Sequence, residues 1–232
     1  MDKFVKVVLL IVFALSATGC ATVNHDALTQ DEALALKDKK VGLTHYQDRP
    51  DFIAQTAVNV QFGLLGLASA ISSGNAMIKN NQVADPAIAI ADKLAQGLAQ
   101  EQQMQVVAEA QSVSSKVTDE ALLGHFGQQD YVLDVKTLGW SSIYFPTDWD
   151  NYRVMYTARA RLIEVQTGKI IADETCSHVP DYADTNQAPS YKALEDGSGL
   201  KTALAQSVEY CVNQIQVMAK LHAQTAGTAA TN

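Results

Sequence analysis

A stretch of regularly alternating side chains, residues 152–165, constrains the fold of this chain most strongly. Every second side chain in it is apolar, and those between are mostly polar or basic; the apolar set is Val154, Tyr156, Ala158, Ala160 and Leu162. Such alternation puts the two sets on opposite faces of a β-strand. Gln166-Thr167-Gly168 then forms a tight turn, because glycine accepts a positive φ, and residues 169–176 return as a second strand. The sequence therefore predicts an antiparallel hairpin with one buried face.

The other face of the predicted hairpin is polar. It carries Arg159 and Arg161 on one strand. Asp134 and Glu174 lie on the two strands expected to flank the strand that carries these arginines. We therefore expect the two carboxylates to pair with Arg159 and Arg161 across the sheet.

Other periodic segments supply the remaining elements of the fold. They are residues 104–108 and 131–138 for strands, and residues 86–100, 118–126 and 200–218 for helices. Asp85 caps the first of these helices and Pro86 occupies its first position. The face of the last helix carries Leu200, Leu204, Val208, Cys211, Ile215 and Met218. The order α-β-α-β-β-β-α predicts an α+β fold, with helices packed on a small sheet that contains antiparallel strands.

Composition excludes several classes of protein. Of 232 residues, 47% are hydrophobic and 18% are charged, which supports a sizeable core and excludes wholesale disorder. The net charge of −8 argues against non-specific nucleic-acid binding, which needs a basic face. The histidines show no metal-ligand spacing, and no nucleophile elbow, phosphate-binding loop or dinucleotide fingerprint occurs. We therefore expect no enzyme, no catalytic residues, no metal site and no cofactor.

The N-terminus has the organisation of a secretory signal peptide. Two lysines precede the apolar residues 7–14, and small residues lead to Cys20. The run is too short to span a bilayer as a stable helix. The ending resembles a bacterial lipobox, although Ala17 stands where leucine is more frequent. The resemblance implies that residues 1–19 are removed and that Cys20 carries a diacylglycerol and a fatty acyl chain such as palmitate; the alternative is an ordinary signal peptide cut elsewhere.

The rest of the chain divides into three parts. Residues 20–50 are rich in charge and lack a long apolar face, so we expect a polar tether that ends at Pro50. Residues 51–224 form a single α+β domain, and residues 225–232 form a disordered tail. Because Ala21 rather than aspartate follows Cys20, resemblance to Gram-negative sorting implies an outer-membrane lipoprotein that faces the periplasm.

An apolar segment rich in glycine and alanine, residues 52–78, precedes the predicted helix at Pro86. Gly66, Ala70 and Gly74 are spaced by four residues and form a smooth stripe on one helical face. Small residues allow another backbone to approach closely. One interpretation is a helix contact between subunits or at the membrane surface. The other is a buried helix under the sheet.

Cys176 and Cys211 are the cysteines that remain once Cys20 is acylated. The even number and an oxidising periplasm favour a disulfide between them. It would pin the last helix to the sheet. The alternative is two buried free thiols.

Aromatic residues concentrate between the second and third predicted strands. They are Trp140, Tyr144, Phe145, Trp149 and Tyr152. Exposed aromatics on a loop form a partner interface, stack on glycan or enter a membrane interface. The alternative is that they cover the open end of the domain's own core.

Several motifs together resemble those of a group of uncharacterised proteobacterial outer-membrane lipoproteins. They are the lipobox, Asp85-Pro86-Ala87, Asp130-Tyr131-Val132-Leu133 and the hairpin with Thr167-Gly168. The element order is similar to that of the periplasmic domain of the curli-secretion lipoprotein and of transport-auxiliary lipoproteins. The resemblance implies a membrane-anchored scaffold or accessory protein of an envelope assembly, with a protein partner or self-association. The alternative function is a membrane-anchored solute- or glycan-binding module.

Overall fold

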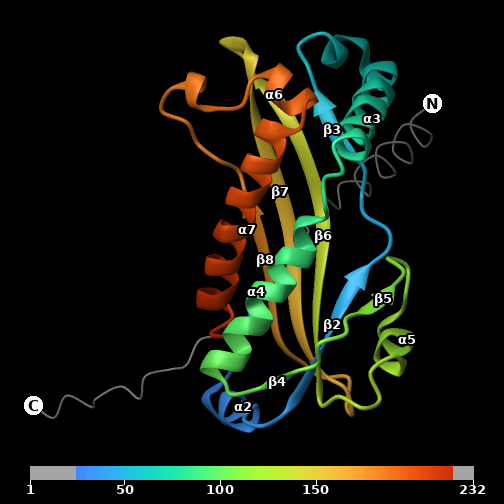
Figure 1. The fold of residues 1–232 in the computed structure, drawn as a ribbon, viewed down its shortest axis with the longest axis vertical. Coiled ribbons are helices and arrows are strands. Elements are labelled where there is room, and N and C mark those ends of the chain that lie inside the picture. Colours follow the sequence, from blue (N-terminus) through green and yellow to red (C-terminus); the bar gives the residue numbers. More distant parts are fainter. Residues whose placement is uncertain (1–24, 222–232) are drawn as a thin grey trace, which may run out of the picture.

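The computed structural model describes residues 25–221, so the signal peptide, Cys20 and the C-terminal tail lie outside the described residues. The fold is α+β, as predicted, and the body is elongated (Figure 1). The strands are β1 (His25–Asp26), β2 (Lys40–Tyr46), β3 (Phe52–Gln55), β4 (Gln105–Val106), β5 (Gln111–Val113), β6 (Tyr131–Phe145), β7 (Asp148–Glu164) and β8 (Ile170–His178). The helices are α2 (Gln30–Ala35), α3 (Gly63–Asn80), α4 (Pro86–Glu101), α5 (Asp119–Gly124), α6 (Tyr191–Glu195) and α7 (Ser198–Met218), with short 3-10 turns η1 (Asn59–Phe62) and η2 (Thr185–Gln187).

The sheet is mixed and is built around the antiparallel strands β6, β7 and β8. Its order is β1-β8-β7-β6-β2-β4, with β3 also paired to β6 and β5 to β2. Strands β2 and β3 run parallel to β6, and β2 also runs parallel to β4 and β5. The predicted hairpin is present: β7 and β8 pair with Ala158 opposite Cys176, and Gly168 has a φ of 70° at the turn.

Helices α4 and α7 cover one face of this sheet (Figure 1). The apolar set predicted for β7 is buried there, and the N-terminus of α4 is capped by Asp85, which accepts a hydrogen bond from the amide of Ala87. The small side chains of Ala158 and Ala160 let the helices lie close to the strand. The predicted apolar face of α7 is buried except for Met218, which is exposed because it is the last residue of the helix.

The expectation of a polar tether over residues 20–50 is wrong for residues 25–50. These residues form β1, α2 and β2, and β2 pairs directly with β6. Leu36, Val41 and Leu43 are buried in the core. The prediction failed because β2 is short and its apolar residues stand among charged neighbours, while its partner strand lies about ninety residues further along the chain.

The aromatic segment is also different from the expected loop. Strand β6 extends to Phe145 and β7 begins at Asp148, so Pro146 and Thr147 form the turn of a long hairpin. Aromatic side chains favour the extended backbone and pair well across strands, which explains why the strands continue through this segment.

The face of the sheet opposite α4 and α7 is called the outer face below. Its lower end is covered by α5 and β5, through a small cluster of Val113, Leu122, Phe126, Val132 and Ile163. The rest of the outer face carries the polar side chains of β6 and β7. No helix among residues 25–221 is long and apolar enough to cross a membrane.

Candidate functional site

The outer face holds an ion network centred on Arg161. Its guanidinium donates hydrogen bonds of 2.9 and 2.6 Å to Asp134 Oδ2, and two of 3.0 Å to the Asp119 carboxylate. Asp134 is only 3% exposed, so Arg161 lies against a carboxylate that is almost completely removed from water. Arg159 forms a second, bidentate pair with Asp173.

The predicted pairing is therefore confirmed for Asp134 with Arg161, and wrong for Glu174. Glu174 lies opposite Ala160 in the ladder, whereas Asp173 lies opposite Arg161. Because side chains alternate between faces along a strand, Glu174 points to the helix-covered face and Asp173 to the outer face. There Glu174 contacts His25 at 2.5 Å and accepts a hydrogen bond of 3.1 Å from Gln214.

Hydrogen bonds and burial shift the pKa values of two groups around Asp134, Tyr46 and Asp119. Tyr46 Oη donates to Asp134 Oδ1 over 2.6 Å, and Thr44 Oγ1 donates to the same oxygen over 3.0 Å. Burial, together with the charge of Asp134, raises the pKa of Tyr46 well above its ordinary value. Hydrogen bonds from Arg161 hold the pKa of Asp119 below its ordinary value. The network therefore joins strands β2, β6 and β7. Neither Tyr46 nor Asp119 is an acid or base that titrates near neutral pH.

A second buried polar cluster ties α4 to the sheet. Thr137 Oγ1 donates to Asp85 Oδ1 over 2.5 Å, and the hydroxyls of Thr137 and Tyr156 lie 2.8 Å apart. Burial raises the pKa of Tyr156 well above its ordinary value. Since Asp85 also caps α4, this cluster positions the helix. Sequence reasoning identified the cap but not its two partners, which lie about fifty and seventy residues away.

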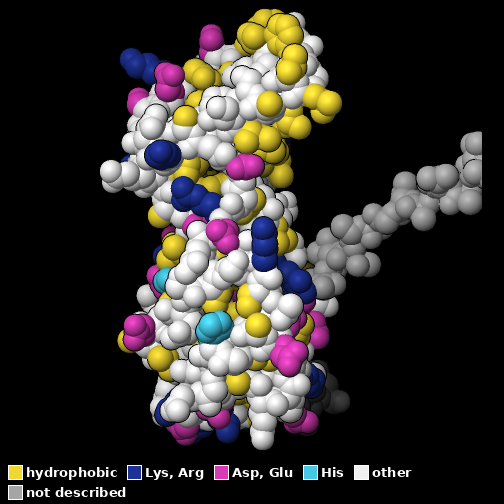
Figure 2. Space-filling model, turned by 90° about the vertical axis from the view of Figure 1, so that its right-hand side faces the viewer, with side chains coloured by type: hydrophobic (Ala, Val, Ile, Leu, Met, Phe, Trp, Pro, Cys, Tyr) yellow, Lys and Arg dark blue, Asp and Glu magenta, His cyan; other side chains and the backbone are white. Residues whose placement is uncertain are grey.

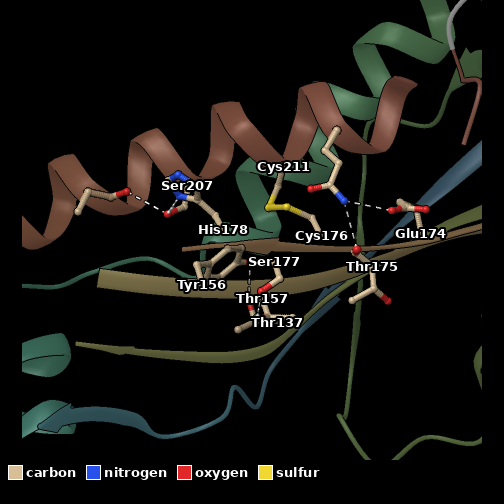
Figure 3. The surroundings of a disulfide bond; sticks show 12 residues. Thr137, Tyr156, Thr157, Glu174, Thr175, Cys176, Ser177, His178, Ser207 and Cys211 are labelled. Atoms are coloured by element: carbon tan, nitrogen blue, oxygen red, sulfur yellow. Dashed lines mark hydrogen bonds between the residues drawn. A yellow bond between two sulfur atoms is a disulfide. The ribbon is translucent and has the colours of Figure 1, made fainter. Parts of the chain in front are cut away.

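The predicted disulfide is present between β8 and α7 (Figure 3). Cys176 and Cys211 are both fully buried, and their Cα atoms are 5.4 Å apart. Near the bond, Gln214 donates to Glu174, and His178 Nδ1 lies 2.9 Å from Ser207 Oγ (Figure 3). Ser207 in turn donates to the Ala203 carbonyl over 3.0 Å, and burial lowers the pKa of His178. The oxidised Cys176 offers no thiolate, so Cys176-Ser177-His178 is not a nucleophilic site in this state.

The aromatic residues predicted as an interface are mostly part of the domain's own packing. Trp140 is 4% exposed, donates from Nε1 to the Pro50 carbonyl over 2.8 Å and packs edge-on against Phe52. Phe145 and Tyr152 are buried, and Tyr144 is half-buried. Trp149 is 62% exposed. The structure therefore supports the core-covering alternative for this set, with Trp149 as its one largely exposed member.

The stripe of Gly66, Ala70 and Gly74 is occupied by the chain itself. A Cβ added at Gly66 would lie 1.7 Å from the Asn59 carbonyl oxygen, and one at Gly74 would lie 2.0 Å from the Phe52 carbonyl oxygen. Helix α3 thus packs its small face on β3 and η1, which supports the buried-helix alternative. The stripe is not an open surface for a second subunit.

A groove of about 500 Å³ crosses the upper part of the outer face. Its apolar lining includes Ile53, Ile71, Leu138, Met155 and Val179, and Thr157 and Ser177 add hydroxyl groups. It lies between α3 and the end of β8, and it combines an apolar lining with a few hydroxyl groups, as small-molecule sites do. No three His, Cys, Asp or Glu side chains among residues 25–221 converge in a way that would hold a metal ion.

No family model matches the chain, and no curated protein matches it. Among solved structures it resembles the PelC dodecamer from Paraburkholderia phytofirmans, with 14% identity and a TM-score of 0.38 over 88% of this chain and 99% of that one.

Two further structures show a similar level of likeness. Protein XCC0632 from Xanthomonas campestris has 11% identity and a TM-score of 0.39, over 80% of this chain and 88% of that one. Lipoprotein GNA1162 from Neisseria meningitidis has 15% identity and a TM-score of 0.27, over 77% and 99%. With TM-scores below 0.5 these likenesses assign no function, and they confirm no specific lipoprotein group.

Proposed function

We propose that this chain is a lipid-anchored scaffold or accessory protein of a bacterial envelope assembly, such as a transport or secretion system, and that it faces the periplasm. The observation that carries the proposal is the state of its three cysteines. Cys176 and Cys211 are joined inside the core, as suits an oxidising compartment. Cys20 is the remaining cysteine and follows the small residues of the lipobox-like ending. A thiol in that position is available for acylation.

The chemistry of the described residues supports a scaffold rather than an enzyme. Arg161 and Arg159 are paired with carboxylates on the outer face. Asp85, Thr137 and Tyr156 bond to one another beneath α4. A catalytic site needs a nucleophile, acid or base open to a substrate, whereas these groups are engaged in joining elements.

Cell fractionation tests the membrane attachment. We expect the wild-type protein in the outer-membrane fraction, resistant to high salt and alkaline carbonate and released by detergent, because several acyl chains give stable anchoring. The Cys20→Ser variant is expected to leave that fraction. Wild-type protein that carbonate releases into the soluble fraction would contradict the proposal.

Chemical crosslinking in intact cells tests the accessory role. We expect lipidated protein to crosslink to a defined envelope protein or to itself, and the Trp149→Ala variant reports whether the exposed indole takes part. If the protein crosslinks to nothing at its native abundance, it does not act as a scaffold.

A second candidate function, membrane-anchored solute or glycan binding, is favoured by the groove beside Ile53 and Met155. The ring of Trp140 borders this groove but is almost completely buried, so the groove offers an apolar floor rather than an aromatic stacking platform. Thr157→Trp fills the groove from a half-buried strand position in its lining. Loss of ligand-dependent stabilisation in that variant, with crosslinking unchanged, would favour solute binding over scaffolding.

A further inference from the structure

The groove on the outer face continues into a second, basic pocket of about 260 Å³. Leu138 lines both cavities, so they share a wall. Three basic side chains line the smaller pocket: Lys136, Arg159 and Arg161. Thr157 in the groove and Arg159 in the pocket are two residues apart on β7, so they lie about 7 Å apart on the same face of the strand. The two cavities therefore form one surface that is apolar above and basic below.

Lys136 is the basic side chain of this pocket that no acid neutralises. Arg159 and Arg161 are both paired with carboxylates, as described above. Among residues 25–221 no carboxylate pairs with Lys136; its ammonium donates a hydrogen bond of 2.8 Å to the Ser115 carbonyl and lies 5.0 Å from the centre of the Tyr46 ring. An ammonium group has three donors, and the carbonyl accepts from one of them. Its positive charge and its other donors are therefore available to a ligand.

The register of the sheet places Lys136 directly opposite Arg159. Like charges in opposite positions on paired strands are destabilising, and a bound anion between them would remove the repulsion. Arg159 also keeps a donor for such an anion, because its pair with Asp173 uses Nε and Nη2 and leaves Nη1. Two basic groups on neighbouring strands are thus arranged to share one anionic group by charge-assisted hydrogen bonds.

The groove defines the other part of the ligand. Its lining is mostly apolar, and its one charged side chain, Asp51, accepts a hydrogen bond of 2.7 Å from Asn75 and disfavours an anion beside it. A ligand that fills both cavities must therefore be apolar towards the upper end and anionic near Lys136. The whole surface follows the same order: Figure 2 shows hydrophobic side chains gathered at the upper end, above a middle and lower surface that is mixed in charge.

We propose that the outer face binds a long-chain fatty acid, with its carboxylate between Lys136 and Arg159 and its aliphatic chain in the groove. A neutral sugar would leave the charge of Lys136 unbalanced, and an inorganic anion would leave the groove empty. The groove, at about 500 Å³, has the size of a site for one small molecule, which favours one chain over the two of a phospholipid. The inference rests on the second candidate function, solute binding in this groove, and it does not require the lipid at Cys20.

Photoaffinity labelling of the mature, lipidated full-length protein tests the proposal. The protein is reconstituted into phosphatidylethanolamine vesicles with a fatty acid that carries a diazirine in the middle of its chain, and the labelled positions are mapped by mass spectrometry of peptides. We expect saturable label on the groove lining, within residues 138–141, 155–157 and 177–179. The unlabelled fatty acid should compete for these positions. Its methyl ester should compete about tenfold less well or worse, because it lacks the charge that strengthens the hydrogen bonds.

Lys136→Met tests the contact with the carboxylate. It should lower the saturable groove label about tenfold or more, and Lys136→Arg should restore most of that label, because it restores the cation. Lys201→Met on α7 is the matched control, since it removes the same charge from an exposed position on the other side of the sheet; its label should equal that of the wild type. Thermal unfolding of each variant shows that a loss of label is not a loss of the fold.

The other outcomes each overturn the proposal in a distinct way. Label that spreads over the surface and does not saturate would reject the groove as the site. Saturable groove label that the methyl ester displaces as well as the acid, or that Lys136→Met leaves unchanged, would reject the anionic head group in favour of a neutral apolar solute. Stronger competition by a lysophosphatidate would replace the carboxylate with a phosphate. Absence of groove label on protein that still fractionates with the outer membrane would reject the ligand and leave the anchored scaffold standing.

Discussion

At the scale of single residues, Asp134 is the side chain whose environment is most demanding. It is almost completely buried, and it bonds to Arg161, Tyr46 and Thr44. A buried carboxylate of this kind is stabilised by its partners but becomes costly when the cation is removed, because the charge then has no counterpart in a region of low dielectric. The ion network on the outer face is therefore a place where one substitution should have a large effect.

Arg161→Met is expected to lower the free energy of unfolding by about 3 kcal/mol, since it leaves Asp134 buried without its cation. Urea denaturation followed by circular dichroism measures the change. Lys93→Met is the control, because Lys93 and its partner Glu209 are both well exposed and such a pair contributes about 1 kcal/mol or less. Similar small losses for both variants would show that the Arg161 pair does not support the fold.

The lowered pKa of Glu32 should make the free energy of unfolding depend on pH. The hydrogen bond from Lys169, followed by those from Thr29, lowers the pKa of Glu32 from its ordinary 4.5 to about 2. The folded state therefore binds this proton less readily than the unfolded state, so the stabilisation is complete above pH 4.5 and is lost as the pH falls towards 2. Glu32→Gln should make the fall in stability over that range shallower, as measured by thermal unfolding at a series of pH values. An unchanged slope would show that Glu32 is not specifically stabilised in the folded state.

At the scale of elements, the disulfide joins α7 to β8 and encloses a long segment of chain. The two cysteines are 35 residues apart in sequence. Closing a loop of that length in the unfolded state stabilises the fold by about 3–4 kcal/mol. The double variant Cys176→Ala, Cys211→Ala should lose about this amount in urea denaturation. Reductant should lower the urea midpoint of the wild type and leave that of the double variant unchanged. An unchanged midpoint of the wild type, after its unfolded chain has been exposed to reductant, would contradict the bond.

The contact of α3 with β3 gives a second prediction at this scale. Gly74→Ala puts a Cβ against the Phe52 carbonyl oxygen, so we expect a loss of about 1–3 kcal/mol despite the better helix propensity of alanine. Gly124→Ala in α5 is the matched control, because nothing lies within 4 Å of the added Cβ, and it should gain up to about 1 kcal/mol. Thermal unfolding of both variants measures the difference. A neutral or stabilising Gly74→Ala would mean that α3 does not lie against β3.

The sequence predicted the elements that are long and locally periodic, and missed those that depend on distant partners. Helices α4 and α7 and strands β7 and β8 each carry enough residues to show their period. Strands β2, β3 and β5 have three to seven residues and pair in parallel with segments far along the chain, so nothing local distinguishes them from loops.

The same distinction applies to the candidate site residues. The pairing of Cys176 with Cys211 was predictable, because it follows from an oxidising compartment and from the even number of cysteines apart from Cys20. Neither requires knowledge of the three-dimensional structure. The burial of Trp140 was not, since its covering residues, Pro50 and Phe52, come from a segment expected to lie elsewhere. Glu174 was assigned to the wrong face because the register between β7 and β8 was unknown. Glu174 lies opposite Ala160, not Arg161, so its side chain points to the helix-covered face.

At the scale of the whole molecule, the body is elongated and its two ends differ. The upper end exposes Phe62, Leu64 and Leu65 and includes the β6–β7 turn, near which Trp149 is exposed (Figure 1). The lower end, at α2 and α5, is polar and is stabilised by capping and ion pairs. The proposed anchor at Cys20 would hold the molecule near its lower end, because His25, five residues further along the chain, pairs with β8 next to α2.

The intact mass of the mature protein extracted from native membranes is the most decisive single measurement. We expect that residues 1–19 are absent, that Cys20 carries a diacylglycerol and a further acyl chain, and that two hydrogens are missing for the Cys176–Cys211 bond. A mass that corresponds to a different N-terminus, or to an unmodified Cys20, would contradict the claim that this chain is a lipid-anchored envelope protein.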